Sequence, residues 1–340
     1  MNIVTKMKHD WDRRAQHHTR YWIATEDYKN EAVFAESGQR TADAIVAALG
    51  PYYKKAWIGL DIGCGIGRVL KPLSFHFRQL IGVDVSAEMI MKSKTWLQGI
   101  PNVTTFETSG VDLKIFPYRH FDFVYSYVAF QHMPRPVFDR YLEEINRVLK
   151  NQGLLVFQIP IGNQPDAPME DTIAVRFYDY HELNTKLKDR GFELIEVTKK
   201  HAGSPQGREL RHEFHQFLVA QKITTIRPDI NVGWLQAECR ERTSFLDTHM
   251  YLSFAENCLN QGDQEEAIHT YEQLLTHNPD SLEAWLKLAT VLIDRGNIDQ
   301  AVSTLTDLTH AHPNYRAAHR TLDNLLQTRQ NIEPTQSPTG

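Results

Sequence analysis

Two regions of the chain differ in how apolar and polar positions alternate. From about Trp57 to Lys222, short apolar runs separate longer stretches with helical spacing. Such alternation predicts a mostly parallel β-sheet with helices on both faces. The runs expected to form strands are WIGLDIG, LIGVDV, VTTFE, FDFVYSYV, GLLVFQI, FELIEV and FHQFLVA.

The segments between the first five runs have apolar residues at helical spacing. They read GRVLKPLSFHF, SAEMIMKSKTWLQ, which begins at the capping residue Ser86, and VFDRYLEEINRVLK, which ends before Asn151. The last two runs are joined by a long polar segment without a helical pattern. We therefore expect these two runs to form an antiparallel pair that closes the sheet.

Beyond Thr248 the chain repeats itself. The stretch that begins at Tyr251 matches the stretch that begins at Trp285, 34 residues later. The matched positions include Gly262 with Gly296, Ala267 with Ala301 and Pro279 with Pro313. This pattern resembles the tetratricopeptide repeat, which pairs two helices per unit. Because about three units are usually needed for stability, RAAHRTLDNLLQTRQ is expected to form a capping helix, and residues 231–246 to pack at the other end.

Composition narrows the classes of partner. The formal net charge of −5 leaves no basic footprint for a nucleic-acid backbone. The three cysteines are widely separated and lack the CxxC spacing of zinc sites, which favours a reducing, cytoplasmic setting and no metal. The N-terminus is polar and no stretch reaches about 18 uninterrupted apolar residues, so no membrane segment is expected.

The sequence LDIGCGIGR contains the strongest chemical signal. Gly63, Gly65 and Gly67 follow a predicted strand and open a helix, where backbone amides can approach a ligand closely. Their spacing differs from the G-x-G-x-x-G of dinucleotide sites, and Arg68 fills the last glycine position of that fingerprint. Asp61 precedes the loop, where a carboxylate would repel a pyrophosphate but attract a cationic group.

The motif DIGCGIG with a later VD resembles the class I S-adenosylmethionine-dependent methyltransferases, over roughly residues 36 to 222. The resemblance implies a Rossmann-like α/β sheet and S-adenosylmethionine as cofactor. Its glycine loop and Asp61 would hold the methionine end, Asp84 with Val85 the ribose, and SGVDL the adenine. Further cofactor contacts are expected from Val111, Asp112, Leu113, Ser126 and Gln131.

The expected organisation has five parts. An N-terminal helical lid (1–50) precedes the methyltransferase domain (51–222), and a linker (223–247) leads to an all-α repeat domain (248–330) and a disordered tail (331–340). The repeats are expected to bind a protein partner or to mediate self-association.

The chemistry expected from the resemblance is methylation of a small-molecule or sugar-like acceptor, at oxygen, with His132 as the base. Substrate contacts are expected from Tyr21, Gln158, Arg176 and Tyr178, and Arg208 and Arg211 are further candidates for the acceptor wall. Several alternatives stay open. His132 can simply start a helix, Asp112 can be a turn residue, the lid aromatics can be packing, and Cys64 is expected to be a small buried filler.

Two other functions compete with this one. A protein methyltransferase would use the repeats to grip a polypeptide, and an adaptor would bind the cofactor without turnover. The sequence leaves open which acceptor is used, which atom is methylated, what the repeats bind and the oligomeric state.

Overall fold

The computed structural model describes residues 1–25, 27–197, 217–226 and 245–332. The chain divides into two compact units, Met1–Arg242 and Thr243–Gly340. No helix within the described ranges is long and apolar enough to cross a membrane.

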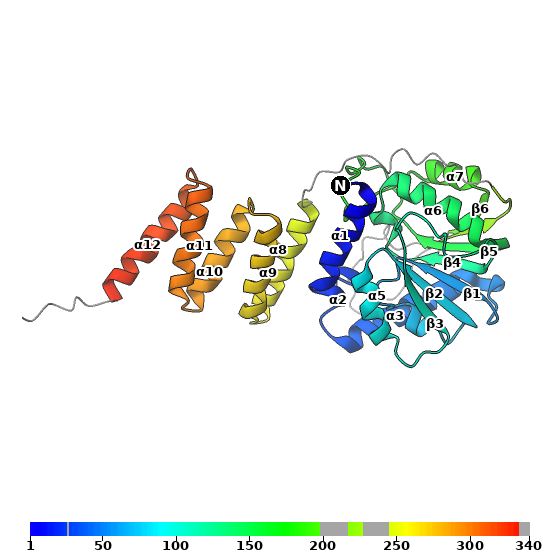
Figure 1. The fold of residues 1–340 in the computed structure, drawn as a ribbon, viewed down its shortest axis with the longest axis horizontal. Coiled ribbons are helices and arrows are strands. Elements are labelled where there is room, and N and C mark those ends of the chain that lie inside the picture. The colour runs from blue at the N-terminus through cyan, green and yellow to red at the C-terminus, as the bar shows by residue number, and fades with distance from the viewer. Residues whose placement is uncertain (26, 198–216, 227–244, 333–340) are drawn as a thin grey trace, which may run out of the picture. The chain divides into compact units, whose positions relative to one another are not determined.

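In the described part of the first unit, seven strands form one sheet with the order β3-β2-β1-β4-β5-β7-β6 (Figure 1). Strands β1 to β5 pair in parallel, and β7 pairs antiparallel with both β5 and β6. This confirms the mostly parallel sheet and the antiparallel closing pair. The strands are β1 (Ile58–Ile62), β2 (Gln79–Asp84), β3 (Val103–Glu107), β4 (Phe121–Ser126), β5 (Leu149–Gln158), β6 (Phe192–Val197) and β7 (Phe217–Lys222).

Both faces of the sheet are covered, as the apolar strands require. One hydrophobic cluster joins the sheet to α6 (Arg135–Val148) and α7 (Tyr180–Asp189), and the other joins it to α3 (Glu31–Leu49), α4 (Leu70–Leu73) and α5 (Ala87–Trp96). Successive side chains of a strand point to opposite faces, so Val124 belongs to the first cluster and Phe123 to the second. A 3-10 turn, η1 (Gly50–Tyr52), leads from α3 towards β1.

The N-terminal segment forms α1 (Ile3–Gln16) and α2 (Thr19–Ile23). Asp12 of α1 accepts hydrogen bonds from the Ser86 hydroxyl (2.7 Å) and the Glu88 amide (3.2 Å), at the N-terminus of α5. On the other side, Asp10 accepts from the Thr172 hydroxyl at 2.7 Å. Helix α1 is therefore bound to two separate segments of the α/β unit.

Three local expectations differ from the structure. Only the four-residue helix α4 forms within the segment GRVLKPLSFHF. Most of the segment forms turns, and its buried apolar residues still join one hydrophobic cluster. Helix α6 ends at Val148, and β5 begins at Leu149, earlier than expected. Helix α7 was not predicted, since only Leu183 and Leu187 are buried along it and the remainder is polar.

The second unit contains five helices in its described part: α8 (Phe245–Asn260), α9 (Gln264–His277), α10 (Leu282–Asp294), α11 (Ile298–Ala311) and α12 (Arg316–Ile332). Consecutive helices pack against each other. The repeated positions behave alike, since Ala267 and Ala301 are both fully buried and Gly262 and Gly296 have φ angles of 81° and 79°. Helix α12 corresponds to the expected capping helix. Most of the segment 231–246 lies outside the described residues.

Candidate active site

The strand order reverses on either side of β1, with β2 on one side and β4 on the other. In open α/β sheets, ligands bind beyond the carboxyl ends of the strands at such a point. A cavity lies here, lined by the loops after β1, β2 and β4 and by helices α1 and α2. Of the sequence-predicted residues, Asp61, Gly63, Gly65, Asp84, Val85 and His132 line it.

The glycine loop has a backbone that only glycine adopts readily. Gly63, Gly65 and Gly67 have φ angles of 77°, 52° and 87°. The amides of Gly63 and Cys64 both donate to the Val83 carbonyl, at 2.8 and 3.0 Å, which fastens the loop to the end of β2. A Cβ atom on Gly63 would lie 2.4 Å from the Ala129 Cβ atom. The loop therefore passes very close to the segment after β4.

Asp84 ties the two adjacent loops together. One carboxylate oxygen accepts from the Gly65 amide (2.8 Å) and the other from the Ser86 amide (2.9 Å). Burial raises its pKa to about 6, although these backbone amides favour the charged form. Each carboxylate oxygen can accept a second hydrogen bond, so Asp84 is still able to accept from a ligand hydroxyl.

Asp61 is 4% exposed and lies at the same cavity. Burial raises its pKa to about 8, the neighbouring Asp84 charge raises it further, and Tyr125 and Arg68 oppose the shift. The buried Asp61 carboxyl group and the partly buried Asp84 carboxyl group thus lie at the same cavity. A cationic ligand would stabilise their charged forms. Cys64 between them is buried, and its raised thiol pKa makes it a packing residue rather than a nucleophile.

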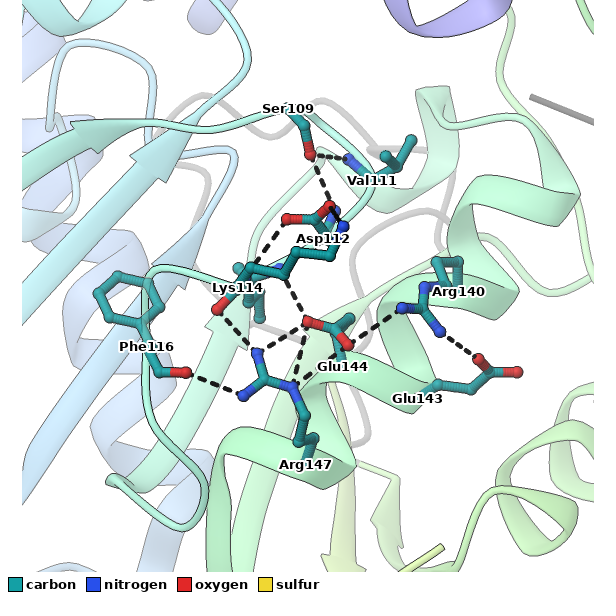
Figure 2. Close-up of polar contacts among 10 residues, drawn as sticks. Ser109, Val111, Asp112, Lys114, Phe116, Arg140, Glu143, Glu144 and Arg147 are labelled. Atoms are coloured by element: carbon teal, nitrogen blue, oxygen red, sulfur yellow. Dashed lines mark hydrogen bonds and ion pairs between the residues drawn. The ribbon is translucent and has the colours of Figure 1, made fainter. Parts of the chain in front are cut away.

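The predicted adenine segment is hydrogen-bonded to side chains of helix α6. The Ser109 hydroxyl accepts from the amides of Val111 (3.3 Å) and Asp112 (3.2 Å), and the Leu113 amide donates to Glu144 (2.9 Å). Figure 2 shows Glu144 and Arg147 side by side beneath this segment. Arg147 also donates to the carbonyls of Leu113 and Phe116, both at 2.8 Å.

None of the three predicted adenine residues, Val111, Asp112 and Leu113, lines the cavity. Gly110 lines the cavity, whereas Val111 and Leu113 have side chains in the hydrophobic core. The Asp112 carboxylate forms an ion pair with Lys114 at 3.0 Å. An adenine contact by Asp112 stays a prediction, and it would compete with this ion pair.

The segment after β4 forms the 3-10 turn η2 (Phe130–His132). His132 lines the cavity, its Nδ1 lies 2.7 Å from the Ile173 carbonyl, and its Nε2 lies 3.1 Å from the Gln131 amide nitrogen. A carbonyl only accepts, so Nδ1 carries the proton and Nε2 has the lone pair. Burial lowers the His132 pKa to about 4, assisted by the nearby charges of Arg14 and Arg176. Ser126 is fully buried, and its hydroxyl donates to the Ile62 carbonyl at 2.9 Å.

None of the four residues expected to contact the substrate lines the cavity, and all four are buried, so these contacts stay predictions. The residues are Tyr21, Gln158, Arg176 and Tyr178. Arg176 donates to the carbonyls of His132 (3.0 Å), Pro168 (2.8 Å) and Asp171 (2.7 Å). Its guanidinium therefore holds the chain around His132. Tyr178 packs on Phe138, with its ring under Arg135, and Tyr21 packs on Trp22. Arg208 and Arg211 lie outside the described residues.

Several residues that line the cavity carried no cofactor or catalytic role in the sequence analysis. They are Met7, Trp11, Trp22 and Ile23 of the lid helices, Arg68, Met89, Tyr127, Met133 and Tyr141. The lid aromatics had a signal, because Trp11 and Trp22 stand out in a polar segment. The sequence contained no such signal for Tyr141, because its apolar neighbours in α6 make it look like a residue of the hydrophobic core.

Comparisons with known proteins agree with this geometry. Residues 60–153 match a family model described as a methyltransferase domain. Residues 60–153 of the first unit therefore carry a methyltransferase domain. Residues 234–281 and 259–325 match tetratricopeptide-repeat models, so the matched repeats begin before Thr248.

The relatives of this methyltransferase domain are distant. A probable methyltransferase of Aspergillus luteorubrus is 28% identical over 161 residues, which cover 44% of this chain and 52% of that protein. Phosphoethanolamine N-methyltransferase 3 of Arabidopsis thaliana is 28% identical over 144 residues, 40% of this chain and 29% of that protein. The chain covers 61% or less of the curated relatives it matches. A magnesium protoporphyrin IX methyltransferase structure from Synechocystis is 16% identical, with a TM-score of 0.47, covering 65% of this chain and 98% of that one.

S-adenosylmethionine is the cofactor that the sequence predicts for a methyltransferase domain, and the residues at the cavity fit it. The ligand is a cation at sulfur and at its amino group, and the carboxyl groups of Asp61 and Asp84 at the cavity favour positive charge. Among the residues that the structure describes, no group of three His, Cys, Asp or Glu side chains is arranged to hold a metal ion.

Proposed function

We propose that this protein methylates a hydroxyl group of a small-molecule or sugar-like acceptor, with S-adenosylmethionine as the methyl donor. The observation that carries the proposal is the cavity itself. It combines the buried carboxyl group of Asp61 and the partly buried carboxyl group of Asp84 with Trp11 and Trp22, so a cationic donor and a small acceptor would meet away from bulk water. The relative named for phosphoethanolamine supports a small acceptor, and as an N-methyltransferase it makes an amine the rival acceptor.

The cofactor supplies an electrophilic methyl group on a sulfonium. The protein would contribute alignment of the acceptor, exclusion of water and removal of a proton. His132 is the residue we assign to the proton, because the residue lines the cavity and its Nε2 has the lone pair. The Gln131 amide, which now contacts Nε2, would give way to the acceptor hydroxyl. Since burial lowers the His132 pKa to about 4, the ring would act from its neutral state.

The acceptor class is tested with radiolabelled S-adenosylmethionine and a cell extract separated into metabolites, glycans, proteins and nucleic acids. We expect label in the metabolite or glycan fraction. A protein treated alike but carrying Asp61→Asn is the control, since asparagine has nearly the same shape and cannot take the charged form that a cationic ligand favours. Mass spectrometry and NMR of the labelled product then separate a methyl ether from a methylamine, and a methylamine would refute the hydroxyl assignment.

A second candidate is methylation of a polypeptide, which the tetratricopeptide repeats favour. Label confined to the protein fraction would establish it. In the main proposal the repeats bind a partner protein or a second copy of the chain. Multi-angle light scattering of the full chain and of a protein ending at Arg242 tests self-association, because only the full chain should change mass with concentration.

A further inference from the structure

Arg68 is a buried cation at the cavity with no role in the site as described so far. It follows the glycine loop directly, is 6% exposed, and lines the same cavity as Asp61 and Asp84. Helix α3 approaches it closely, because a Cβ atom on Gly38 would lie 2.4 Å from the Arg68 carbonyl oxygen. The chain therefore builds close packing around this side chain.

The Arg68 guanidinium is only partly satisfied by neutral groups. Nη1 donates to the hydroxyls of Ser37 (3.0 Å) and Thr41 (3.4 Å), while the buried Nε has no acceptor. Within the described ranges, no carboxylate lies within ion-pair distance of it. The Tyr127 ring lies 5.6 Å from its Cζ atom. A buried guanidinium without a carboxylate partner is unfavourable unless a ligand supplies one.

The charges that line the cavity match the charges of the cofactor. S-adenosylmethionine has a sulfonium and an ammonium, which suit the two acidic side chains, and one carboxylate, which suits a guanidinium fork. We propose that Arg68 binds the methionyl carboxylate of the cofactor. The proposal rests on the use of S-adenosylmethionine by this domain.

The test compares two ligands that differ only in that carboxylate. Calorimetry of the full chain measures the affinities of S-adenosylhomocysteine and of its decarboxylated analogue. The wild-type protein should bind S-adenosylhomocysteine about ten- to hundredfold more tightly, as expected for a charge-assisted pair. Arg68→Met should weaken only the carboxylate-bearing ligand, so that the preference disappears.

Two further variants serve as controls. Arg40→Met removes an arginine of the same helix region that pairs with Asp27 and Glu36 and does not line the cavity, so the preference should persist. Arg68→Lys keeps the charge but loses the fork, and an intermediate preference is expected.

Three results would overturn the proposal. If Arg68→Met weakened the binding of both ligands equally, Arg68 would have only a structural role between the glycine loop and α3. An unchanged preference in that variant would exclude the contact, and so would a wild-type protein that binds both ligands equally well, whether or not the variant folds. Failure of the wild-type protein to bind either ligand would instead refute use of the cofactor.

Discussion

Asp61 and His132 line one cavity, and burial moves both residues towards the uncharged form. The pKa of Asp61 rises to about 8 and that of His132 falls to about 4. Near neutral pH the ligand-free cavity therefore contains a largely protonated acid and a neutral imidazole. A cationic ligand would favour the deprotonated, charged form of Asp61 and leave His132 neutral. The cavity would then have an anion for the methyl donor and a neutral imidazole that can accept a proton.

The first prediction concerns Asp61 and the stability of the ligand-free protein. Its folded pKa of about 8 lies above the ordinary value of 3.8, so between these pH values the folded state holds a proton that the unfolded state has lost. Stability contributed at this site is thus lost as pH rises. We expect Asp61→Asn to flatten the fall in the free energy of unfolding between pH 5.5 and 8, measured with urea. The exposed-site variant Asp43→Asn should follow the wild type, and parallel curves for all three proteins would contradict the assignment.

The same pKa predicts how S-adenosylmethionine binding depends on pH. A cation favours the charged Asp61, so binding should release a proton and tighten by up to about tenfold per pH unit between pH 6 and 8. Calorimetry in buffers with different ionisation enthalpies measures the proton release. In the Asp61→Asn variant, the protons released by the ligand itself should be unchanged. Only the proton released by Asp61 should be lost. Equal proton release by both proteins would count against a role for Asp61.

For His132 the structure alters the expected pH dependence. The side chain was chosen from the sequence because an unperturbed histidine titrates near neutrality, whereas burial keeps this one neutral from pH 6 to 9. His132→Asn should lower the methylation rate by about 10²- to 10⁴-fold if the ring accepts the proton. The shape of the pH profile should stay unchanged, and cofactor affinity should be unaffected. A near-normal rate would leave alignment and water exclusion as the whole of the catalysis.

At the scale of elements, the cavity depends on contacts between segments far apart in the chain. Asp12 of α1 meets the N-terminus of α5, and Arg176 meets the turn η2. Helix α6 supports the predicted adenine segment through Glu144 and Arg147 (Figure 2). These polar contacts fix the N-terminus of α5, the turn η2 and the predicted adenine segment relative to other parts of the unit.

The Glu144–Arg147 pair leads to a prediction with a matched control. Glu144 is 2% exposed, pairs with Arg147 at 2.8 Å and accepts the Leu113 amide. Glu144→Gln leaves Arg147 buried without its anion and should lower the free energy of unfolding by about 3 kcal/mol. Glu143→Gln removes a neighbouring, more exposed pair with Arg140, at 2.9 Å, and should cost about 1 kcal/mol or less. Urea unfolding compares the two, and equal losses would show that the buried Glu144–Arg147 ion pair adds no more stability than the more exposed pair.

At the scale of the whole chain, the two units differ in how they are stabilised. The first has a sheet whose strands pair across long sequence separations, and the second stacks consecutive helices. Residues Ile223 to Ile226 still belong to the first unit, because Ile223 donates to the Gly191 carbonyl (2.9 Å) and Ile226 to the Asn146 side chain (3.2 Å). A cut at Lys222 would remove these contacts.

We therefore predict that a protein ending at Arg242 keeps the cofactor affinity of the full chain. Its own hydrophobic clusters cover both faces of the sheet without any residue of the repeats. Calorimetry with S-adenosylhomocysteine measures the affinity, and circular dichroism checks the fold. A shorter protein that ends at Lys222 is expected to be less stable. Loss of binding in the Arg242 protein would mean that the repeats complete the methyltransferase domain.

The sequence by itself determined the features that depend on local spacing. Apolar runs identified the strands, the positive φ angles of Gly63, Gly65 and Gly67 required glycine at a tight turn, and the offset from Tyr251 to Trp285 revealed the repeats. Each of these follows from residues close together in the chain or from a fixed period, so no knowledge of packing was needed.

Only the tertiary structure decided the roles that depend on what surrounds a side chain. From its charge and its place in the sequence, Arg176 was expected to contact the substrate. In the structure its guanidinium donates to backbone carbonyls of other segments instead. Arg68 lies at the cavity where α3 packs against its backbone, and desolvation together with the nearby Arg14 and Arg176 charges keeps His132 neutral by lowering its pKa. Burial and charge are set by neighbours distant in sequence, and folding alone brings those neighbours together.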